Sequence, residues 1–319
     1  MKRLQRLYRR RLPPQGIITP DLSRTLARLS FETNRQLGLL INRRGEIERV
    51  IVGDHRSILI PELTPTRGHS SRLRGLRCVH THLKGEPLTE DDFMDLVFLR
   101  LDLMAVLEVD GHGGARRLLT AHLLPENVNG KGWLLLDPLP AHDPELDFLQ
   151  LVQSLEDEFA RKQALLEVGG NQDRAILVSV TSKSRAKAEA SMAELTELAR
   201  SSGIAVAERI IQRQQRINPK YLMGRGKLSE LVLQALQSGV DLLIFDQDLN
   251  PSQMRSITDF TELRIIDRTQ LILDIFAQRA KSREGKIQVE MAQLQYLLPR
   301  LVVKDDALSR LTGGIGSRG

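Results

Sequence analysis

The sequence contains little cysteine and no long apolar run, and both absences limit what the protein can be. Cys78 is the one cysteine among 319 residues, so an intrachain disulfide is excluded and a reducing compartment is favoured. No apolar run approaches the ~18 residues that a membrane-spanning helix needs. The N-terminal stretch MKRLQRLYRRRLPP is basic and lacks the apolar core of a secretory signal. We therefore expect a cytoplasmic protein with no membrane partner.

The charge balance favours a polyanionic partner. Lysine and arginine number 46 against 40 aspartates and glutamates, which gives a net charge of +6 and a pI of about 9.6. Such an excess suits a partner such as nucleic acid, and it can equally serve solubility. Hydrophobic residues at 41% and charged residues at 27% describe a folded chain rather than a disordered one. The length is sufficient for two domains.

The first part of the chain predicts a basic tail and then a mixed α/β domain. Residues 1–16 carry a cluster of lysines and arginines and end in a Pro-Pro pair that stops a helix. This tail either contacts phosphates or is a flexible solvated arm. Residues 17–142 contain a predicted helix over 89–102 and strand-like runs at 37–42, 48–53, 103–109 and 132–140.

The second part predicts a small parallel sheet followed by a helical hairpin. A helical connector over 143–172 ends in EVGGNQD, which predicts a domain boundary. Residues 173–268 alternate strands and helices, a rhythm typical of a parallel α/β sheet. Residues 269–319 predict two antiparallel helices and a glycine-rich loop. The cations between the helices could contact RNA or simply face solvent; they are Arg279, Lys281, Arg283 and Lys286.

The second half contains four distinctive stretches: NPKYLMGRGKLSEL at 218–231, FDQDLNPSQMRSI at 245–257, the run from IIDRTQ at 265–270 to LLPRL at 297–301, and LSRLTGGIGSRG at 308–319. In these stretches the chain resembles the HflX family of translational GTPases. The resemblance implies an N-terminal α/β subdomain and a hairpin that precede a GTPase domain. It also implies binding to the large ribosomal subunit and its rRNA, in ribosome splitting or rescue, through the four tip cations together with Arg310 and Arg318.

The sequence contains no P-loop. A P-loop reads GxxxxGK[ST], so that backbone amides and a lysine hold the phosphates while a hydroxyl binds Mg²⁺. The nearest string, GRGK at 224–227, is followed by Leu228, and we interpret it as a turn into a helix. We therefore expect no GTP hydrolysis by this chain alone, and GTP and Mg²⁺ only if a GTPase domain follows.

A different pattern, CVHTHLKGEPLTEDD, occupies residues 78–92. His80 and His82 point the same way if the segment is extended, and Asp92 lies where a helix is predicted to begin. Two imidazoles and a carboxylate with an open fourth position are typical of catalytic zinc. The alternative is an ordinary loop that contains histidines. Other potential ligands are His112, His122 and Cys78, of which the thiol is better explained as a small buried side chain.

The same pattern resembles the JAMM/MPN metalloprotease family and its RadC-like relatives. In that family H-x-H is followed, after seven residues, by Ser-x-x-Asp. Here the spacer is six residues, Thr89 stands for the serine, and Leu83 stands where proline is usual. The resemblance implies an MPN-like fold for residues 17–142 and a Zn²⁺ ion on His80, His82 and Asp92. It further implies that Glu32 activates a water molecule and that Thr89 supports an oxyanion.

The two halves thus predict two compatible functions. The one we favour from the sequence is a ribosome-associated factor that lacks GTPase activity of its own. The alternative is a zinc-dependent peptidase or isopeptidase in residues 17–142. A third interpretation is a regulatory dimerisation module, and the sequence leaves the oligomeric state open.

Overall fold

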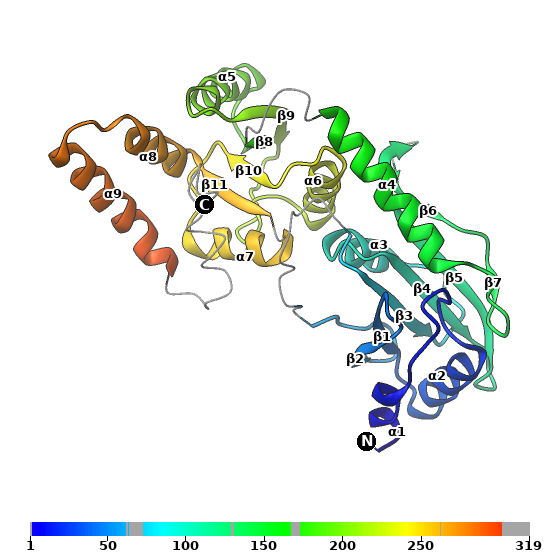
Figure 1. Cartoon of the computed structure of the whole chain (residues 1–319). Coiled ribbons are helices and arrows are strands. Elements are labelled where there is room, and N and C mark those ends of the chain that lie inside the picture. The colour runs from blue at the N-terminus through cyan, green and yellow to red at the C-terminus, as the bar shows by residue number, and fades with distance from the viewer. Residues whose placement is uncertain are drawn as a thin grey trace. The chain divides into compact units, whose positions relative to one another are not determined.

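The chain forms two compact units, the first ending at Lys162 and the second continuing from Gln163. The computed structural model describes residues 2–61, 63, 73–128, 131–166, 173–261 and 263–301 (Figure 1). The predicted mixed α/β class is confirmed, with antiparallel and parallel strands together in the first unit and parallel strands in the second. No helix within these ranges is long and apolar enough to cross a membrane.

The first unit is built on a mixed sheet. Its described strands run in the order β2-β1-β3-β4-β5-β6, with β7 paired to β5. Only the β3–β4 pair is parallel among the pairings of this sheet that the structure describes. The strand bounds are β1 Leu37–Asn42, β2 Ile47–Val52, β3 Leu76–His82, β4 Leu103–Val109, β5 Ala115–Val128, β6 Lys131–Leu135 and β7 Leu139–Pro140.

Helices cover both faces of strand β3, which is buried along its whole length. Helix α2, Pro20–Thr33, lies on the face to which Thr81 points, because Ser30 Oγ is 2.6 Å from Thr81 Oγ1. Helix α4, Phe148–Leu166, begins on that same face, where the Arg77 guanidinium lies over the Phe148 ring at 4.4 Å. Helix α3, Glu90–Phe98, contacts the opposite face, the one that carries the even-numbered side chains of β3.

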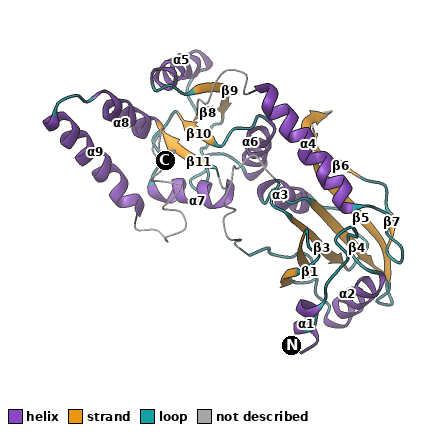
Figure 2. Ribbon diagram, in the orientation of Figure 1, coloured by secondary structure: helices purple, strands orange, loops and turns teal. Residues whose placement is uncertain are grey.

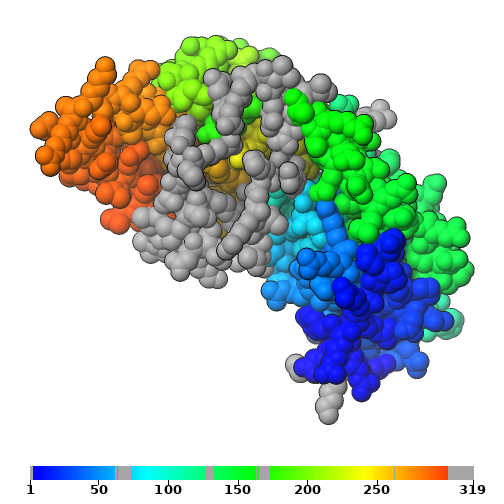
Figure 3. All heavy atoms as spheres, viewed as in Figure 1, coloured from blue at the N-terminus to red at the C-terminus, as the bar shows by residue number. Residues whose placement is uncertain are grey.

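The basic N-terminal segment packs against the rest of the first unit, so of the two interpretations of this tail the flexible solvated arm is wrong for residues 2–12. Helix α1, Lys2–Gln5, and a short 3-10 turn η1, Leu7–Arg9, bring Leu7 and Leu12 into buried positions. Arg10 Nη1 donates to Asp21 Oδ2 at 2.5 Å. In Figure 3 the dark-blue N-terminal atoms form a continuous surface with the rest of this unit.

The second unit is the parallel sheet that the alternating pattern predicts. Its order is β11-β10-β8-β9, and every described pair in it is parallel (Figure 2). The elements are β8 Arg174–Thr181, α5 Arg185–Ser201, β9 Ala205–Arg213, α6 Arg225–Gln237, β10 Leu242–Phe245, α7 Pro251–Thr261 and β11 Arg264–Asp267. Leu177, Ile244 and Ile266 of the sheet form one apolar core with Leu195 of α5 and Leu271 of the next helix.

Two helices follow the sheet: α8 Arg268–Arg279 and α9 Arg283–Leu301. Helix α9 contacts the rest of the unit through polar side chains. Gln293 donates to Asp274 at 2.9 Å, the Tyr296 hydroxyl donates to the buried Asp267, and Arg300 donates to the Leu249 carbonyl at 2.7 Å. The apolar residues that predict this helix by their three- and four-residue spacing are exposed; they are Ile287, Met291, Leu294 and Leu298.

We predict that Asp267→Asn destabilises the hairpin of α8 and α9. Asp267 is buried and accepts hydrogen bonds from Leu249 N, Gln270 N and Tyr296, with Arg300 3.7 Å away. Losing this charge is expected to cost about 2–4 kcal/mol. Hydrogen exchange of the amides in α8 and α9 measures the loss. The control Asp248→Asn removes a carboxylate that accepts from Thr269 in an exposed setting. Equal effects of the two variants would contradict this role of Asp267.

Candidate functional sites: a metal centre and a basic hairpin tip

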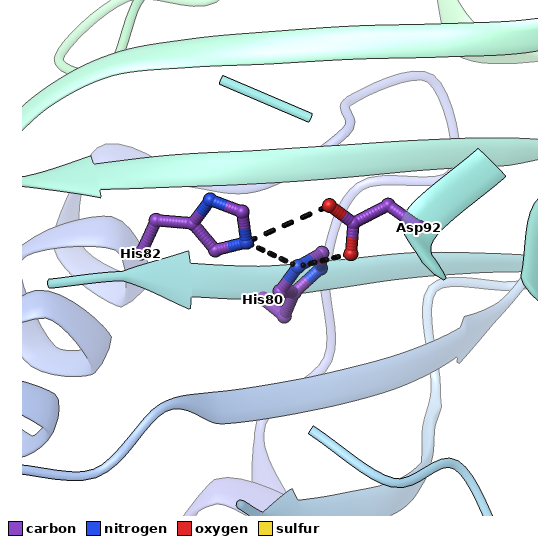
Figure 4. A group of neighbouring side chains, drawn as sticks. All are labelled: His80, His82 and Asp92. Carbon is purple, nitrogen blue, oxygen red and sulfur yellow. Dashed lines mark hydrogen bonds and ion pairs between the residues drawn. The ribbon is translucent and has the colours of Figure 1, made fainter. Parts of the chain in front are cut away.

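The segment 78–92 brings two histidines and an aspartate together. His80 and His82 lie two residues apart on β3, so both side chains point to the face covered by α3. Asp92 is the third residue of α3, which begins after the N-cap residue Thr89. Figure 4 shows the three side chains converging from strand and helix. Within the described residues, they form the one group of three or more potential metal-ligating side chains.

The spacing of the ligand atoms fits a tetrahedral ion. His80 Nε2 lies 3.0 Å from His82 Nε2 and 3.0 Å from Asp92 Oδ1, and His82 Nε2 lies 3.6 Å from Asp92 Oδ2. Zinc binds nitrogen and oxygen at about 2.0–2.1 Å, which gives a tetrahedral edge of about 3.3 Å. The two histidine nitrogens, and each histidine nitrogen with one of the two Asp92 oxygens, are therefore separated by distances near that edge.

Burial and charge leave Asp92 and His82 in the states that a metal needs. His80 is 0%, His82 2% and Asp92 7% exposed. Burial raises the pKa of Asp92, but the hydrogen bond and charge of His80, the Thr89 backbone hydrogen bond and the charge of His82 together lower it to about 2. Burial, together with the neighbouring His80, lowers the pKa of His82. At neutral pH the group therefore offers a carboxylate and an unprotonated His82 nitrogen.

Further contacts hold the ligands in position. His82 Nδ1 is 3.0 Å from the Glu86 carbonyl, an arrangement in which Nδ1 carries the proton and Nε2 keeps a free lone pair. Asp92 Oδ2 accepts from the Thr89 backbone N at 2.7 Å and from Thr89 Oγ1 at 2.8 Å. His80 Nδ1 is buried and has no hydrogen-bond partner among the described residues.

Glu32 is not part of this group. It lies near the end of α2, on the opposite face of the sheet, rather than on a strand beside the histidines. Arg3 and Arg28 donate to its carboxylate at 2.6 and 3.0 Å, and these contacts lower its pKa. A base that activates a metal-bound water must reach that water. The expected role for Glu32 is therefore wrong, because we mistook the last turn of a helix for a position beside the sheet.

The other potential ligands also lie elsewhere. His112 is in the exposed turn between β4 and β5. His122 faces the α4 side of the sheet, since the Glu158 charge acts on it, and burial lowers its pKa. Cys78 is on the histidine face but falls outside the ligand group. Its thiol is buried, as expected, and burial together with the charges of Asp95 and Asp92 raises its pKa.

Two glutamates that lie near the histidines were not predicted from the sequence. Glu86 supplies the carbonyl for His82, and its charge also acts on the His82 pKa. Glu108 of β4 is the parallel register partner of His82, so it points to the same face. It is buried and bound on both oxygens by Arg117, at 2.8 and 3.0 Å. A lone glutamate in the apolar run LMAVLEV was the available signal, but the register that brings it beside His82 is a tertiary property.

In the second unit, the candidate site is the turn between α8 and α9, which lies at the end of the hairpin away from the sheet (Figure 1). The turn is shorter than expected, because α9 already begins at Arg283. Ser282 Oγ accepts from the Gly285 amide at 3.0 Å and so caps that helix. The tip cations, Arg279, Lys281, Arg283 and Lys286, are all exposed. Arg310 and Arg318 lie outside the described residues.

The GRGK string has the structural role that the sequence predicts. Gly224 is the N-cap residue of α6, and Arg225 is its first residue. The Lys227 ammonium pairs with Glu230 one turn further on, at 2.5 Å. This lysine therefore neutralises a carboxylate of its own helix.

Comparison with known proteins finds relatives of the second unit. Residues 189–277 match the family described as GTP-binding GTPase N-terminal, and residues 279–319 match the GTP-binding GTPase Middle Region. The chain is 51% identical over 131 residues to the GTPase HflX of Alkalihalophilus pseudofirmus, a match that covers 41% of this chain and 31% of that protein. It is 44% identical over 126 residues to the GTPase HflX of Escherichia coli, covering 40% of this chain and 30% of that protein.

These matches confirm the resemblance to HflX for the second unit, which carries the N-terminal region of an HflX-type protein. The chain spans about a third of the length of the curated relatives that it matches. Among solved structures, a GTP-binding protein from the hyperthermophilic archaeon Sulfolobus solfataricus in complex with GDP is similar at 26% identity and a TM-score of 0.34. That match covers 41% of this chain and 38% of that one.

We predict that the Cys78 thiol is unreactive in the folded protein. Only the thiolate is nucleophilic, and burial first, then the nearby carboxylates, holds the pKa of Cys78 well above its ordinary value of 9.0. The expected result is slow reaction with a disulfide reagent at pH 8 and fast reaction in guanidinium chloride. A native rate equal to the denatured rate would show that Cys78 is accessible.

Proposed function

We propose that the second unit is the ribosome-binding, N-terminal portion of an HflX-type translational GTPase. In this proposal the basic hairpin tip contacts rRNA of the large ribosomal subunit during ribosome splitting or rescue. The observation that carries it is the cluster of four exposed cations at the tip: Arg279, Lys281, Arg283 and Lys286. None of them forms an ion pair with another residue in the part of the chain that the structure describes.

The stability of α9 does not explain the two cations in its first turn. A helix N-terminus favours acidic residues, yet α9 begins with Arg283 and has Lys286 in its first turn, with Glu284 as the acid between them. Each misplaced cation costs roughly 0.3–1 kcal/mol when exposed. Contact with the phosphates of folded RNA would offset that penalty, because counterions leave the RNA when lysine and arginine neutralise its phosphates.

Nucleotide hydrolysis is not part of this proposal. The described start of α6 pairs Lys227 with a carboxylate, and the chain carries no P-loop sequence. GTP and Mg²⁺ would be bound by a GTPase domain, as the name of the relatives implies for those proteins. The part assigned to this chain is attachment to the ribosome.

Reversing the four tip charges to glutamate should weaken binding to purified large subunits by roughly a hundredfold, since four phosphate contacts are lost. Sedimentation across a range of salt concentrations measures both the affinity and its salt dependence, which should become shallower. A matched control reverses four exposed cations at helix α5: Lys183, Arg185, Lys187 and Arg200.

The control separates a specific tip contact from general attraction between opposite charges. It changes the net charge by the same amount as the tip variant, so nonspecific binding should fall equally in both. Binding that survives tip reversal, or that falls as much in the control, would remove the tip from the interface.

We propose a second function for the first unit, the binding of a divalent metal, with zinc the expected ion. It is supported by three buried side chains whose nitrogen and oxygen atoms are separated by distances near the edge of a zinc tetrahedron. Peptide hydrolysis would also need a base, and Glu32 lies on the wrong face. The second proposal is therefore limited to metal binding by His80, His82 and Asp92, and it covers neither peptidase nor isopeptidase activity.

Protein purified without a histidine tag is expected to bind one zinc ion in calorimetry. His82→Ala should abolish stoichiometric binding because it removes one of three ligands. Glu32→Gln serves as the control and should leave both stoichiometry and affinity unchanged. Absence of zinc binding by the unaltered protein, or equal binding by His82→Ala, would exclude this site.

A further inference from the structure

The proposed metal site joins two elements that are otherwise linked by an exposed loop. His80 and His82 end the buried strand β3, whereas Asp92 belongs to the first turn of α3. Residues 83–88 connect them, and this stretch is mostly exposed or half-buried. An ion on all three ligands would therefore cross-link the strand to the start of the helix.

Asp92 uses its two oxygens for two different purposes. Oδ1 faces His80 Nε2 at 3.0 Å. Oδ2 accepts from Thr89 N at 2.7 Å and from Thr89 Oγ1 at 2.8 Å, and the Asp92 amide donates back to Thr89 Oγ1 at 3.3 Å. This reciprocal capping box defines where α3 begins. The same carboxylate thus caps a helix through Oδ2 and contacts His80 through Oδ1, while His82 Nε2 lies 3.6 Å from Oδ2.

His82 also contacts the loop at residues 83–88. His82 Nδ1 contacts the Glu86 carbonyl at 3.0 Å, and Glu86 Oε2 accepts from the Lys84 amide at 2.9 Å. The loop, the helix start and the ligands therefore share one hydrogen-bond network. Contacts of this kind orient ligands and commonly change metal affinity by about 10–100-fold when removed.

We propose that metal binding and formation of the N-terminus of α3 are one coupled event, in which Thr89 is the positioning residue. This inference rests on the proposed metal site. Thr89 donates its hydroxyl proton to the carboxylate that faces His80, so its effect on the ion passes through Asp92. The ion then acts as a structural tie between β3 and α3. The role that we expected for Thr89, support of an oxyanion, is replaced by orientation of a ligand.

The coupling predicts that Thr89→Val weakens zinc binding. Calorimetry of the full, tag-free chain with zinc chloride should give an affinity about 10–100-fold lower than that of the unaltered protein. Thr89→Ser keeps a hydroxyl at the same place and should restore the affinity. The matched control is Thr19→Val, because Thr19 is the N-cap residue of α2 in the same unit and accepts from Leu22 N at 3.3 Å.

Thr19→Val removes an equivalent cap far along the chain from the ligands. It is expected to lower the melting temperature while leaving zinc affinity unchanged. Zinc should also slow hydrogen exchange of the amides at residues 89–95 more than of those in α2. At zinc concentrations near 100 times Kd, the melting temperature of the unaltered protein should rise by about 5–10 °C.

The outcomes separate this inference from the metal site on which it rests. No zinc binding by the unaltered protein overturns the site itself. Stoichiometric zinc binding with equal affinity in Thr89→Val overturns the coupling and keeps the site. The coupling is likewise overturned if zinc leaves exchange in α3 unchanged. If Thr89→Val does not fold, the effect of zinc on hydrogen exchange at residues 89–95 of the unaltered protein still decides the question.

Discussion

The buried carboxylate of Asp267 fixes the geometry of the second unit. It ends β11 and caps α8 through the Gln270 amide, and it accepts from Leu249 N and from Tyr296 of α9. A buried carboxylate that loses its partners costs several kcal/mol, so the fold is most stable when all of these donors stay within hydrogen-bonding distance of Asp267. The start of α8 and the position of α9 follow from this one residue. The position of the basic tip relative to this sheet is therefore set by Asp267 at the end of β11.

In the first unit, the alternation of side chains along β3 decides which residues lie together. Thr81 points to α2, where it bonds Ser30, while His80 and His82 point to α3. One strand thus separates a face that packs against α2 and α4 from a face that carries the ligand group and packs against α3. The parallel pairing of β3 with β4 further brings Glu108 beside His82. Whether a residue lies beside the ligand group therefore depends more on the face of the sheet to which it points than on its distance from His82 along the sequence.

The sequence predicted much of the fold and part of the candidate sites. The alternating strands and helices of the second unit were found because each has its own hydrophobic periodicity. His80, His82 and Asp92 were found because their spacing is local. Glu32 was misplaced because α2 was not recognised, and faces of a sheet are set by tertiary contacts. The outward apolar side of α9 was missed since helical periodicity identifies a stripe without saying what it faces.

Attachment of the chain to the large ribosomal subunit through its hairpin tip is the central claim. Cross-linking of the full chain to large subunits, with mass spectrometry of the peptides joined to rRNA, tests it most directly. The account predicts cross-links concentrated in residues 279–286, where the exposed cations lie. Cross-links confined to the basic residues of the first unit, with none at the tip, would contradict it.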